Sequence, residues 1–274
     1  MLGTAQDGGL PQIACPCTNC APAWTNPSLR RSVVCLGLVA RPACRSWLMD
    51  ASPDFREQLH FLQSLAPECS LAGIVLTHAH TGHYSGLIHL GREAWNTSAM
   101  SVYASPRMSD FLARNAPWSQ LVSDGSIQLH AFSPTAQVEL SPALKILPYP
   151  VPHRDEYSDT LAFVVQGPSR KLFYCPDIDD WGLLKMDLRQ LVAQMDVALL
   201  DGTFFSAAEL LDREVADIPH PLVTDTAARL RDVECDVRLV HLNHTNPLHR
   251  PGSQRTWLAA QGIRVGALGD CWIL

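Results

Sequence analysis

The sequence lacks any apolar run of the roughly 18 to 20 residues that a membrane-spanning helix needs. Its N-terminus also lacks the basic and then apolar pattern of a secretion signal, so we expect a soluble, cytoplasmic protein without a membrane partner. No basic run is longer than Arg30-Arg31 and the net charge is −6, which argues against nucleic acid as a partner. No G-x-S-x-G pattern occurs, which disfavours a serine hydrolase.

Linkers and repeats are absent as well. No stretch is rich enough in Gly, Ser or charge to separate two domains, and no segment is repeated or of low complexity. The chain has 274 residues, of which 47% are hydrophobic, so it can bury a large core. We therefore expect residues 1–274 to form a single domain that acts on a small-molecule substrate, and we leave open whether it forms a homodimer.

The nine cysteines do not form a pattern typical of a disulfide scaffold, because their number is odd and three of them crowd into residues 15–20. Three thiolates on a tight turn, from Cys15, Cys17 and Cys20, suit a tetrahedral zinc ion that needs a fourth ligand. His244 is our candidate for that ligand. The alternative is a redox pair of Cys17 and Cys20, but no thioredoxin-like βαβ pattern follows it.

Three histidines directly follow the apolar run at residues 74–76 and therefore occupy the loop that leaves a buried strand. They are His78, His80 and His83. Neutral imidazoles bind Zn, Fe and Mn well, and two of them separated by one residue can reach the same ion. We interpret the cluster as a metal site rather than as histidines that cap a loop.

Four more predicted strands are each followed or ended by a His or an Asp. These residues are His153 after 144–151, Asp177 after 171–175, Asp201 after 197–200 and His241 after 237–240. Side chains at strand ends are held by a rigid scaffold, while the loops remain free to shape a pocket. Five such strand ends imply one common site, and we expect the loops at 96–99, 154–159 and 205–221 to select the substrate.

The apolar spacing predicts two groups of strands interrupted by helices. We expect a hairpin at 32–40 and 46–49, helices at 84–95, 108–115 and 223–232, and mainly strands from 127 to 173. Another helix should begin near Phe55, with Ser52 as its N-cap and Pro53 in its first turn. The Gly-rich segment 3–9 matches no phosphate-binding motif, so we expect a flexible turn that passes close to the site. This pattern favours an α/β fold with two packed sheets and helices outside.

The order of the candidate ligands resembles that of the metallo-β-lactamase superfamily. The residues are His78, His80, His83, His153, Asp177 and His241, and the resemblance covers nearly the whole chain. It implies an αβ/βα sandwich of two mixed β-sheets flanked by helices, with a metal site at one edge. The cysteine cluster and residues 50–54 resemble one branch of this superfamily in particular. That branch contains the pyrroloquinoline quinone (PQQ) biosynthesis protein B and the phosphodiesterase of the carbon–phosphorus lyase pathway. Residues 201–204 and 241–247 also look like the PQQ protein.

The resemblance also implies roles for the metal ligands. One ion would be held by His78, His80 and His153, and a second by His83 and His241, with Asp177 bridging the two. The active-site ions would be Zn, Mn or Fe, and a hydroxide bound to them would be the nucleophile.

Two further roles follow from the same resemblance. Asp201 and His220 would act together as a proton donor; the alternatives are a turn cap for Asp201 and a surface loop position for His220. His244 would complete a structural zinc site, although the sequence leaves open whether His241 and His244 exchange their roles.

The chain departs from the superfamily pattern at Gly82, where an Asp is usual. The second ion thereby loses a carboxylate ligand, so both a one-metal and a two-metal enzyme are consistent with the sequence. The PQQ protein keeps fewer histidines at the first cluster than this chain does. The sequence therefore looks more like a working hydrolase than its named relative.

We expect a metal-dependent hydrolase that attacks a phosphodiester, a lactone or a related ester. The alternative is a metal-dependent step in PQQ biosynthesis, oxidative or carrier in kind, for which the open coordination position left by Gly82 would suit a redox metal such as Fe. A metal-binding scaffold without catalysis would explain the cysteine cluster with His244, but it would leave five residues without a role, namely His78, His80, His83, His153 and Asp177.

Overall fold

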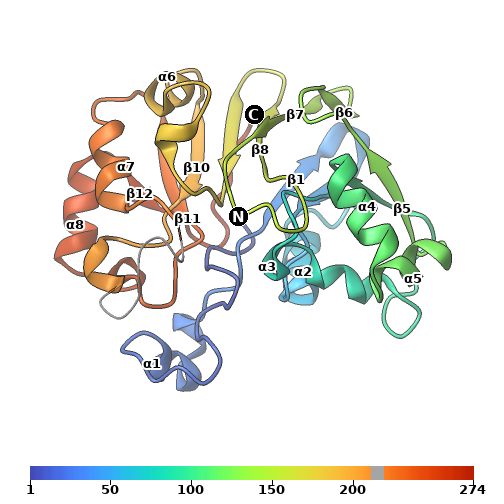
Figure 1. Cartoon of the computed structure of the whole chain (residues 1–274), viewed down its shortest axis with the longest axis horizontal. Coiled ribbons are helices and arrows are strands. Elements are labelled where there is room, and N and C mark those ends of the chain that lie inside the picture. The colour runs from blue at the N-terminus through green and yellow to red at the C-terminus, as the bar shows by residue number, and fades with distance from the viewer. Residues whose placement is uncertain (211–218) are drawn as a thin grey trace.

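The computed structural model describes residues 1–210 and 219–274. Two β-sheets pack against each other, with helices on their outer faces (Figure 1). The first sheet has the order β1 (Leu36–Ala40), β2 (Arg45–Met49), β3 (Ser70–Val75), β4 (Met100–Ala104) and β5 (Ile127–Ala131). The second has the order β12 (Arg264–Val265), β11 (Asp236–Val240), β10 (Val197–Asp201), β9 (Lys171–Cys175), β8 (Leu161–Gln166), β7 (Leu144–Pro150) and β6 (Val138–Ser141).

Helices cover the outer face of each sheet. The first sheet carries α2 (Phe55–Leu65), α3 (Thr81–Tyr84), α4 (Pro106–Arg114) and α5 (Trp118–Ser123), and the second carries α6 (Leu188–Val192), α7 (Val223–Arg229) and α8 (Ser253–Ala260). A short helix, α1 (Cys20–Thr25), lies apart from both groups at the bottom of Figure 1. The 3-10 helices are η1 (Pro27–Leu29), η2 (Arg41–Ala43), η3 (Ser85–Leu90), η4 (Trp181–Leu183), η5 (Ala207–Leu210) and η7 (Pro247–His249). None of the helices in the described ranges is both long and apolar enough to span a bilayer.

The strand β8 shows how the layers are built from the two-residue period of a strand. Leu161, Phe163 and Val165 point into the core between the two sheets. Ala162 and Val164 point to the opposite face, toward the helices of the second sheet. Because both faces of the strand are buried, its sequence is a continuous apolar run rather than an alternating one. The expected αβ/βα sandwich of two mixed sheets is confirmed.

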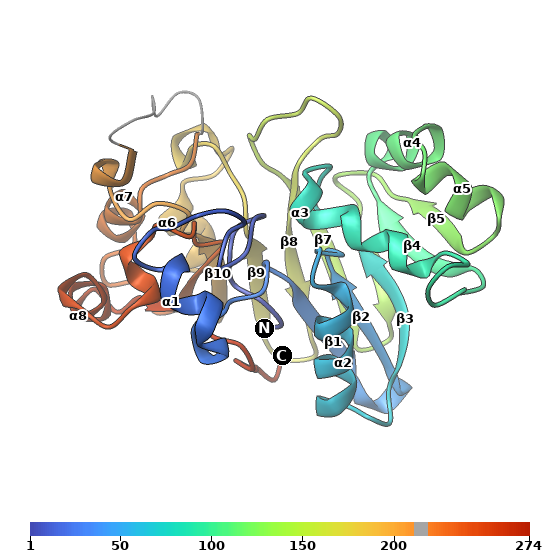
Figure 2. The same ribbon diagram turned by 90° about the horizontal axis from the view of Figure 1, so that it is seen from below.

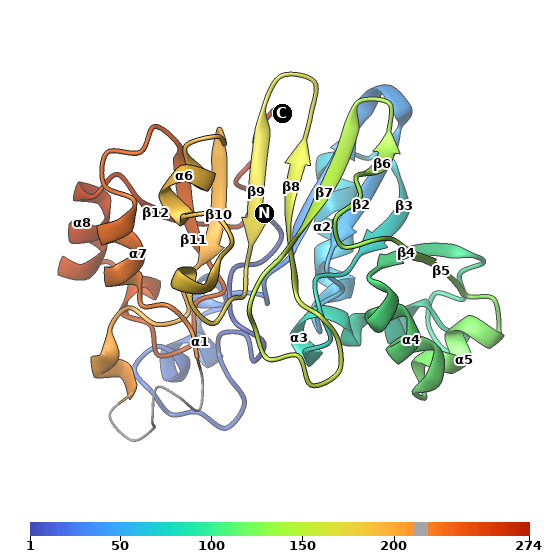
Figure 3. The ribbon, with the colours of Figure 1, turned by 45° about the horizontal axis from the view of Figure 1, so that its top comes forward.

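The carboxyl ends of several strands meet at one edge of the sandwich, the lower edge in Figure 3. In the second sheet β9, β10 and β11 are parallel, and β7 runs the same way because both β7 and β9 are antiparallel to β8. In the first sheet β2 and β3 are parallel. The residues that follow these strands are therefore gathered at one place, although they are far apart in the sequence.

Two expected helix boundaries are wrong. Ser52 is not the N-cap of α2, which begins at Phe55 after Asp54; the Ser52 hydroxyl instead accepts the Asp54 N–H in a preceding turn. The helix expected at 84–95 is only α3 followed by η3, which ends at Leu90. Its backbone bonds across to a neighbouring segment, because the Gly86 N–H donates to the Ala51 carbonyl at 2.9 Å.

The core between the sheets provides a test of this arrangement. Phe163 is fully buried there, so Phe163→Ala should lower the free energy of unfolding by about 3 to 5 kcal/mol. Leu147 on β7 is 41% exposed, and Leu147→Ala should cost about 1 kcal/mol or less. Urea unfolding followed by circular dichroism measures both, and equal shifts of the two midpoints would contradict the packing of the two sheets.

Candidate metal centre

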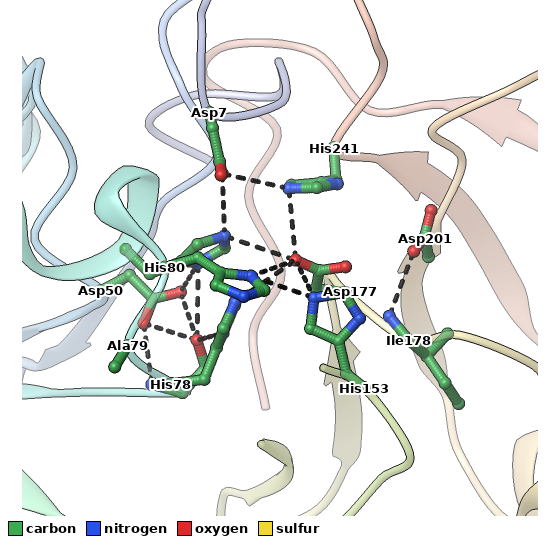
Figure 4. Close-up of polar contacts among 12 residues, drawn as sticks. Asp7, Asp50, His78, Ala79, His80, His153, Asp177, Ile178, Asp201 and His241 are labelled. Atoms are coloured by element: carbon green, nitrogen blue, oxygen red, sulfur yellow. Dashed lines mark hydrogen bonds and ion pairs between the residues drawn. The ribbon is translucent and has the colours of Figure 1, made fainter. Parts of the chain in front are cut away.

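A first group of donor atoms lies around the carboxylate of Asp177 (Figure 4). The Asp177 Oδ2 atom is 3.3 Å from Nε2 of His78 and 3.1 Å from Nε2 of His153. Nε2 of His153 is in turn 3.1 Å from Nδ1 of His80. Four ligands around a tetrahedral zinc ion stand roughly 3.3 Å from one another, because each is about 2.0 to 2.1 Å from the metal. The four residues predicted for the first ion therefore have the spacing of a ligand set.

A second group lies next to the first and shares Asp177 with it. Nε2 of His83 and Nε2 of His241 are 3.8 and 3.7 Å from the same Asp177 Oδ2 atom. Both nitrogens also approach a carboxylate that the sequence did not suggest as a ligand, that of Asp7, at 3.3 and 3.5 Å. The single oxygen Oδ2 of Asp177 therefore borders both groups, as a bridging ligand would.

Several atoms in these groups are buried and have no hydrogen-bond partner among residues 1–210 and 219–274. They are Oδ1 of Asp7 and Nε2 of His78, His83 and His241. A buried polar atom without a partner costs about 1 to 3 kcal/mol, and buried polar atoms in proteins are almost always paired. Metal ions between these atoms would satisfy them, so the residues present fit a metal centre.

Thr77 and Thr203 hold two of the histidines in the orientation that ligation needs. Each threonine hydroxyl donates to a buried carboxylate, that of Asp50 or Asp201, at 2.9 and 2.7 Å. Each hydroxyl must therefore accept from the neighbouring imidazole: Nδ1 of His78 lies 2.9 Å from Thr77, and Nδ1 of His241 lies 2.9 Å from Thr203. With the proton on Nδ1, the lone pair of Nε2 faces the centre.

Each of these two carboxylates also binds one imidazole directly. Nδ1 of His83 lies 2.8 Å from Asp50, and Nδ1 of His220 lies 2.8 Å from Asp201. Asp179 plays the same part for His153, at 2.7 Å.

The structure places the predicted proton-donor pair beside the metal groups. His220 is buried rather than on the surface, with Nδ1 also 3.4 Å from Oδ1 of Asp177. Burial lowers the pKa of His220, but the Asp201 carboxylate outweighs it and the pKa rises above its ordinary value. Asp201 also caps a turn, since it accepts the Thr203 N–H at 2.9 Å. Asp201 therefore contacts both a turn and His220, as its two suggested roles require.

The charges of the centre favour a cation. Burial raises the pKa of Asp177, but the imidazoles of His153, His241 and His220 outweigh it and hold the pKa well below its ordinary range. Burial likewise lowers the pKa of His83, but Asp50 and then Asp7 raise it well above the ordinary value. The buried carboxylates thus favour protonation of His83 and His153, and a metal ion has to displace such protons in order to bind these imidazoles.

The cysteine cluster forms a separate site with His244. Nδ1 of His244 lies 3.4, 3.5 and 3.6 Å from the sulfurs of Cys15, Cys17 and Cys20. One nitrogen and three sulfurs around tetrahedral zinc stand roughly 3.5 Å apart, given bonds of about 2.0 and 2.3 Å. His241 belongs to the other centre, so the two histidines occupy the places that the resemblance implied and are not exchanged.

The comparisons with known proteins agree with this geometry. A family model described as the beta-lactamase superfamily domain matches residues 45–245. The chain belongs to the metallo-β-lactamase superfamily. It is 26% identical to the coenzyme PQQ synthesis protein B of Methylorubrum extorquens, over 97% of this chain and 96% of that protein. The resemblance predicted from the order of the ligands is thus confirmed.

Two solved structures are similar in fold. Zn(2+)-bound PqqB from Methylobacterium extorquens has a TM-score of 0.84 at 23% identity, covering 100% of this chain and 98% of that one. A diphosphatase from the PhnP family has a TM-score of 0.66 at 20% identity, covering 97% and 92%. Membership of the superfamily places this chain among the metallo-hydrolases as a class.

The loops expected to select the substrate are placed only in part. Glu156 in the loop 154–159 has its Oε2 atom 3.5 Å from Nε2 of His80, so this loop borders the centre. Within the loop 205–221, residues 211–218 lie outside the described residues. The residues that the sequence did not reveal are Asp7, Asp179, Thr77 and Thr203, whose contacts with the ligands are visible only in the folded structure.

Removal of one thiolate should abolish the structural metal alone. Cys17→Ser should lower the zinc content of purified protein by one ion per chain, because three ligands hold zinc far more weakly than four. Cys44→Ser removes an exposed thiol between η2 and β2 and should leave the zinc content unchanged. Elemental analysis of both variants decides the point, and an unchanged zinc content in Cys17→Ser would refute the site.

Removal of one imidazole should act on the other centre. His80→Ala should lose the ion of the first group, since His80 provides one of its four donors, and should keep the cysteine-bound ion. His60→Ala, on the exposed side of α2, is the matched control. The same elemental analysis applies, and a metal content equal to that of the wild type would mean that the first group holds no ion.

Proposed function

We propose that the chain is a metal-dependent hydrolase of a small phosphodiester, lactone or related ester. The observation that supports this most directly is the position of Asp177, whose Oδ2 atom borders two groups of imidazoles while His220 stands at its other oxygen. Such a site has what ester hydrolysis needs, namely two adjacent cation positions and a proton donor beside them.

The residues that would hold the ions follow from the distances. His78, His80, His153 and Asp177 would hold the first, and His83, His241 and Asp177 the second. Zinc, manganese or iron bound there would lower the pKa of a coordinated water toward neutrality and stabilise charge on the ester oxygens.

The Asp201 and His220 pair supplies the proton chemistry. The Asp201 carboxylate binds Nδ1 of His220 and stabilises the protonated ring. Nε2 is then the nitrogen that can give a proton to the leaving oxygen. General acid catalysis of this kind contributes about 10²- to 10⁴-fold, and most where the leaving group is a poor one.

A second candidate function is a metal-dependent step in PQQ biosynthesis. It is supported by the similarity to coenzyme PQQ synthesis proteins, which extends over 97% of the chain. A redox metal such as iron, bound with an open coordination position of the kind that Gly82 leaves, would suit oxidative chemistry. Deletion in a PQQ-producing host tests it: loss of PQQ supports this function, and normal PQQ output counts against it.

The leaving group tests the role of His220. In the metal-loaded protein, His220→Ala should lower kcat about 10²- to 10⁴-fold for an alkyl phosphodiester, whose leaving alkoxide needs a proton. The loss should be less than about tenfold for a p-nitrophenyl ester, whose leaving group does not need one. Metal content by elemental analysis should equal that of the wild type.

Equal losses on the two substrates would show that His220 only supports the structure. The hydrolase proposal itself fails if the metal-loaded wild type turns over no member of a panel of phosphodiesters, lactones and β-lactams.

A further inference from the structure

The second group would hold its ion with fewer ligands than the first if only the predicted residues took part. His83, His241 and the shared Asp177 are three donors. Position 82, where the superfamily pattern has Asp, is a glycine. The structure nevertheless has a carboxylate beside this group, because Asp7 from the N-terminal segment points to it (Figure 4).

Asp7 occupies the place of a fourth donor. Its Oδ1 atom lies 3.3 Å from Nε2 of His83 and 3.5 Å from Nε2 of His241. These three atoms are buried and none of them has a hydrogen-bond partner in the described structure. Both imidazoles are held from their other side, at Nδ1, by Asp50 and Thr203. Three converging atoms without partners, on side chains that are already fixed, mark the position of a cation.

The position of Asp7 requires a glycine at residue 82. A Cβ atom on residue 82 would lie 2.2 Å from Oδ1 of Asp7 and 2.8 Å from its Cα. No side chain at position 82 can therefore coexist with Asp7 in this position. The absence of a side chain at 82 is the condition under which the Asp7 carboxylate reaches His83.

The segment that carries Asp7 is held in place by its own backbone bonds. The Gln6 N–H donates to the Leu242 carbonyl at 3.0 Å, and the Leu242 N–H donates to the Thr4 carbonyl at 3.0 Å. Ala5 also pairs with Val33, which precedes the first strand. In Figure 2 this dark-blue segment lies between the two halves of the molecule. The carboxylate is thus positioned next to His241 by contacts that need no metal.

We propose that Asp7 is a ligand of the second active-site ion and replaces the carboxylate that position 82 lacks. The inference rests on the proposed metal centre and gives the second group four donors: two imidazoles, the shared Asp177 and Asp7. Asp7, from a distant part of the chain, then supplies the carboxylate that is missing at Gly82. The centre accordingly binds two ions.

The test is a metal titration of the full chain after chelation and dialysis, with manganese and with zinc as probes. Wild type should bind two ions in the histidine centre besides the cysteine-bound ion. Asp7→Asn keeps the size of the side chain but removes the charge, and should raise the Kd of the second ion about a hundredfold or more, since even partners of ligands are worth about 10- to 100-fold. The first ion and the cysteine-bound ion should remain.

Two further variants separate ligation from charge and from folding. Gly82→Ala should displace Asp7 and weaken the second ion in the same way, with Asp7 itself unchanged. Asp187→Asn is the charge-matched control, since Asp187 is an N-cap far along the chain and Asn caps equally well. It should bind metal as the wild type does. Electron paramagnetic resonance of the manganese form should show coupled ions in wild type and an isolated ion in Asp7→Asn.

Each other result has a definite meaning. Two ions bound with unchanged affinity by Asp7→Asn would overturn the role of Asp7 and leave the metal centre standing, as an ion pair between Asp7 and protonated His83 would predict. Only one ion in the wild-type centre would also overturn it. No ion in the histidine centre of wild type would instead refute the proposed function.

Discussion

The buried carboxylate of Asp177 is the interaction on which this site depends. Its Oδ2 atom lies within 3.9 Å of a nitrogen on each of five imidazoles, which come from both sheets. A negative charge with 3% exposure is costly to bury unless cations surround it. The five rings can meet this need as protonated imidazoles or as ligands of metal ions. The strand ends are therefore arranged around one oxygen atom, and the sheets meet where that oxygen lies.

The residues that orient the ligand histidines form the same arrangement in both halves of the molecule. Asp50, at the end of β2, binds Thr77 and His83, and through the threonine it orients His78. Asp201, at the end of β10, binds Thr203 and His220, and through the threonine it orients His241. Each half thus fixes two rings with one carboxylate and one hydroxyl. Because these groups follow buried strands, the geometry is set by the sheets rather than by the loops.

The ligands at strand ends could be predicted because they are local features: an apolar run followed by His or Asp. Their order along the chain was enough to indicate the superfamily, which the family model confirms. Asp7 could not be predicted, since its position depends on the pairing of Ala5 with Leu242, far apart in sequence. The expected helix at 84–95 was also wrong: the segment forms α3 and then the 3-10 helix η3, which ends at Leu90. Sequence patterns predict which ligands each segment can provide, whereas long-range backbone pairing decides which of these ligands come together.

The two metal groups differ in how they depend on the fold. The first draws its ligands from the ends of β3, β7 and β9, which the sheet cores hold. The second includes Asp7, which directly follows a segment that is bonded to the rest of the fold. Gln6 and Thr4 bond to Leu242, the residue after His241, and Ala5 pairs with Val33, which precedes the first sheet. Occupation of the second group is therefore coupled to the docking of the N-terminal segment, whereas occupation of the first is not. Two adjacent ions favour hydrolysis, because they can stabilise both the attacking and the leaving oxygen, whereas a single ion with an open position suits redox chemistry. Which of the two candidate functions the site favours thus depends on whether Asp7, 75 positions before Gly82 in the sequence, completes the second group.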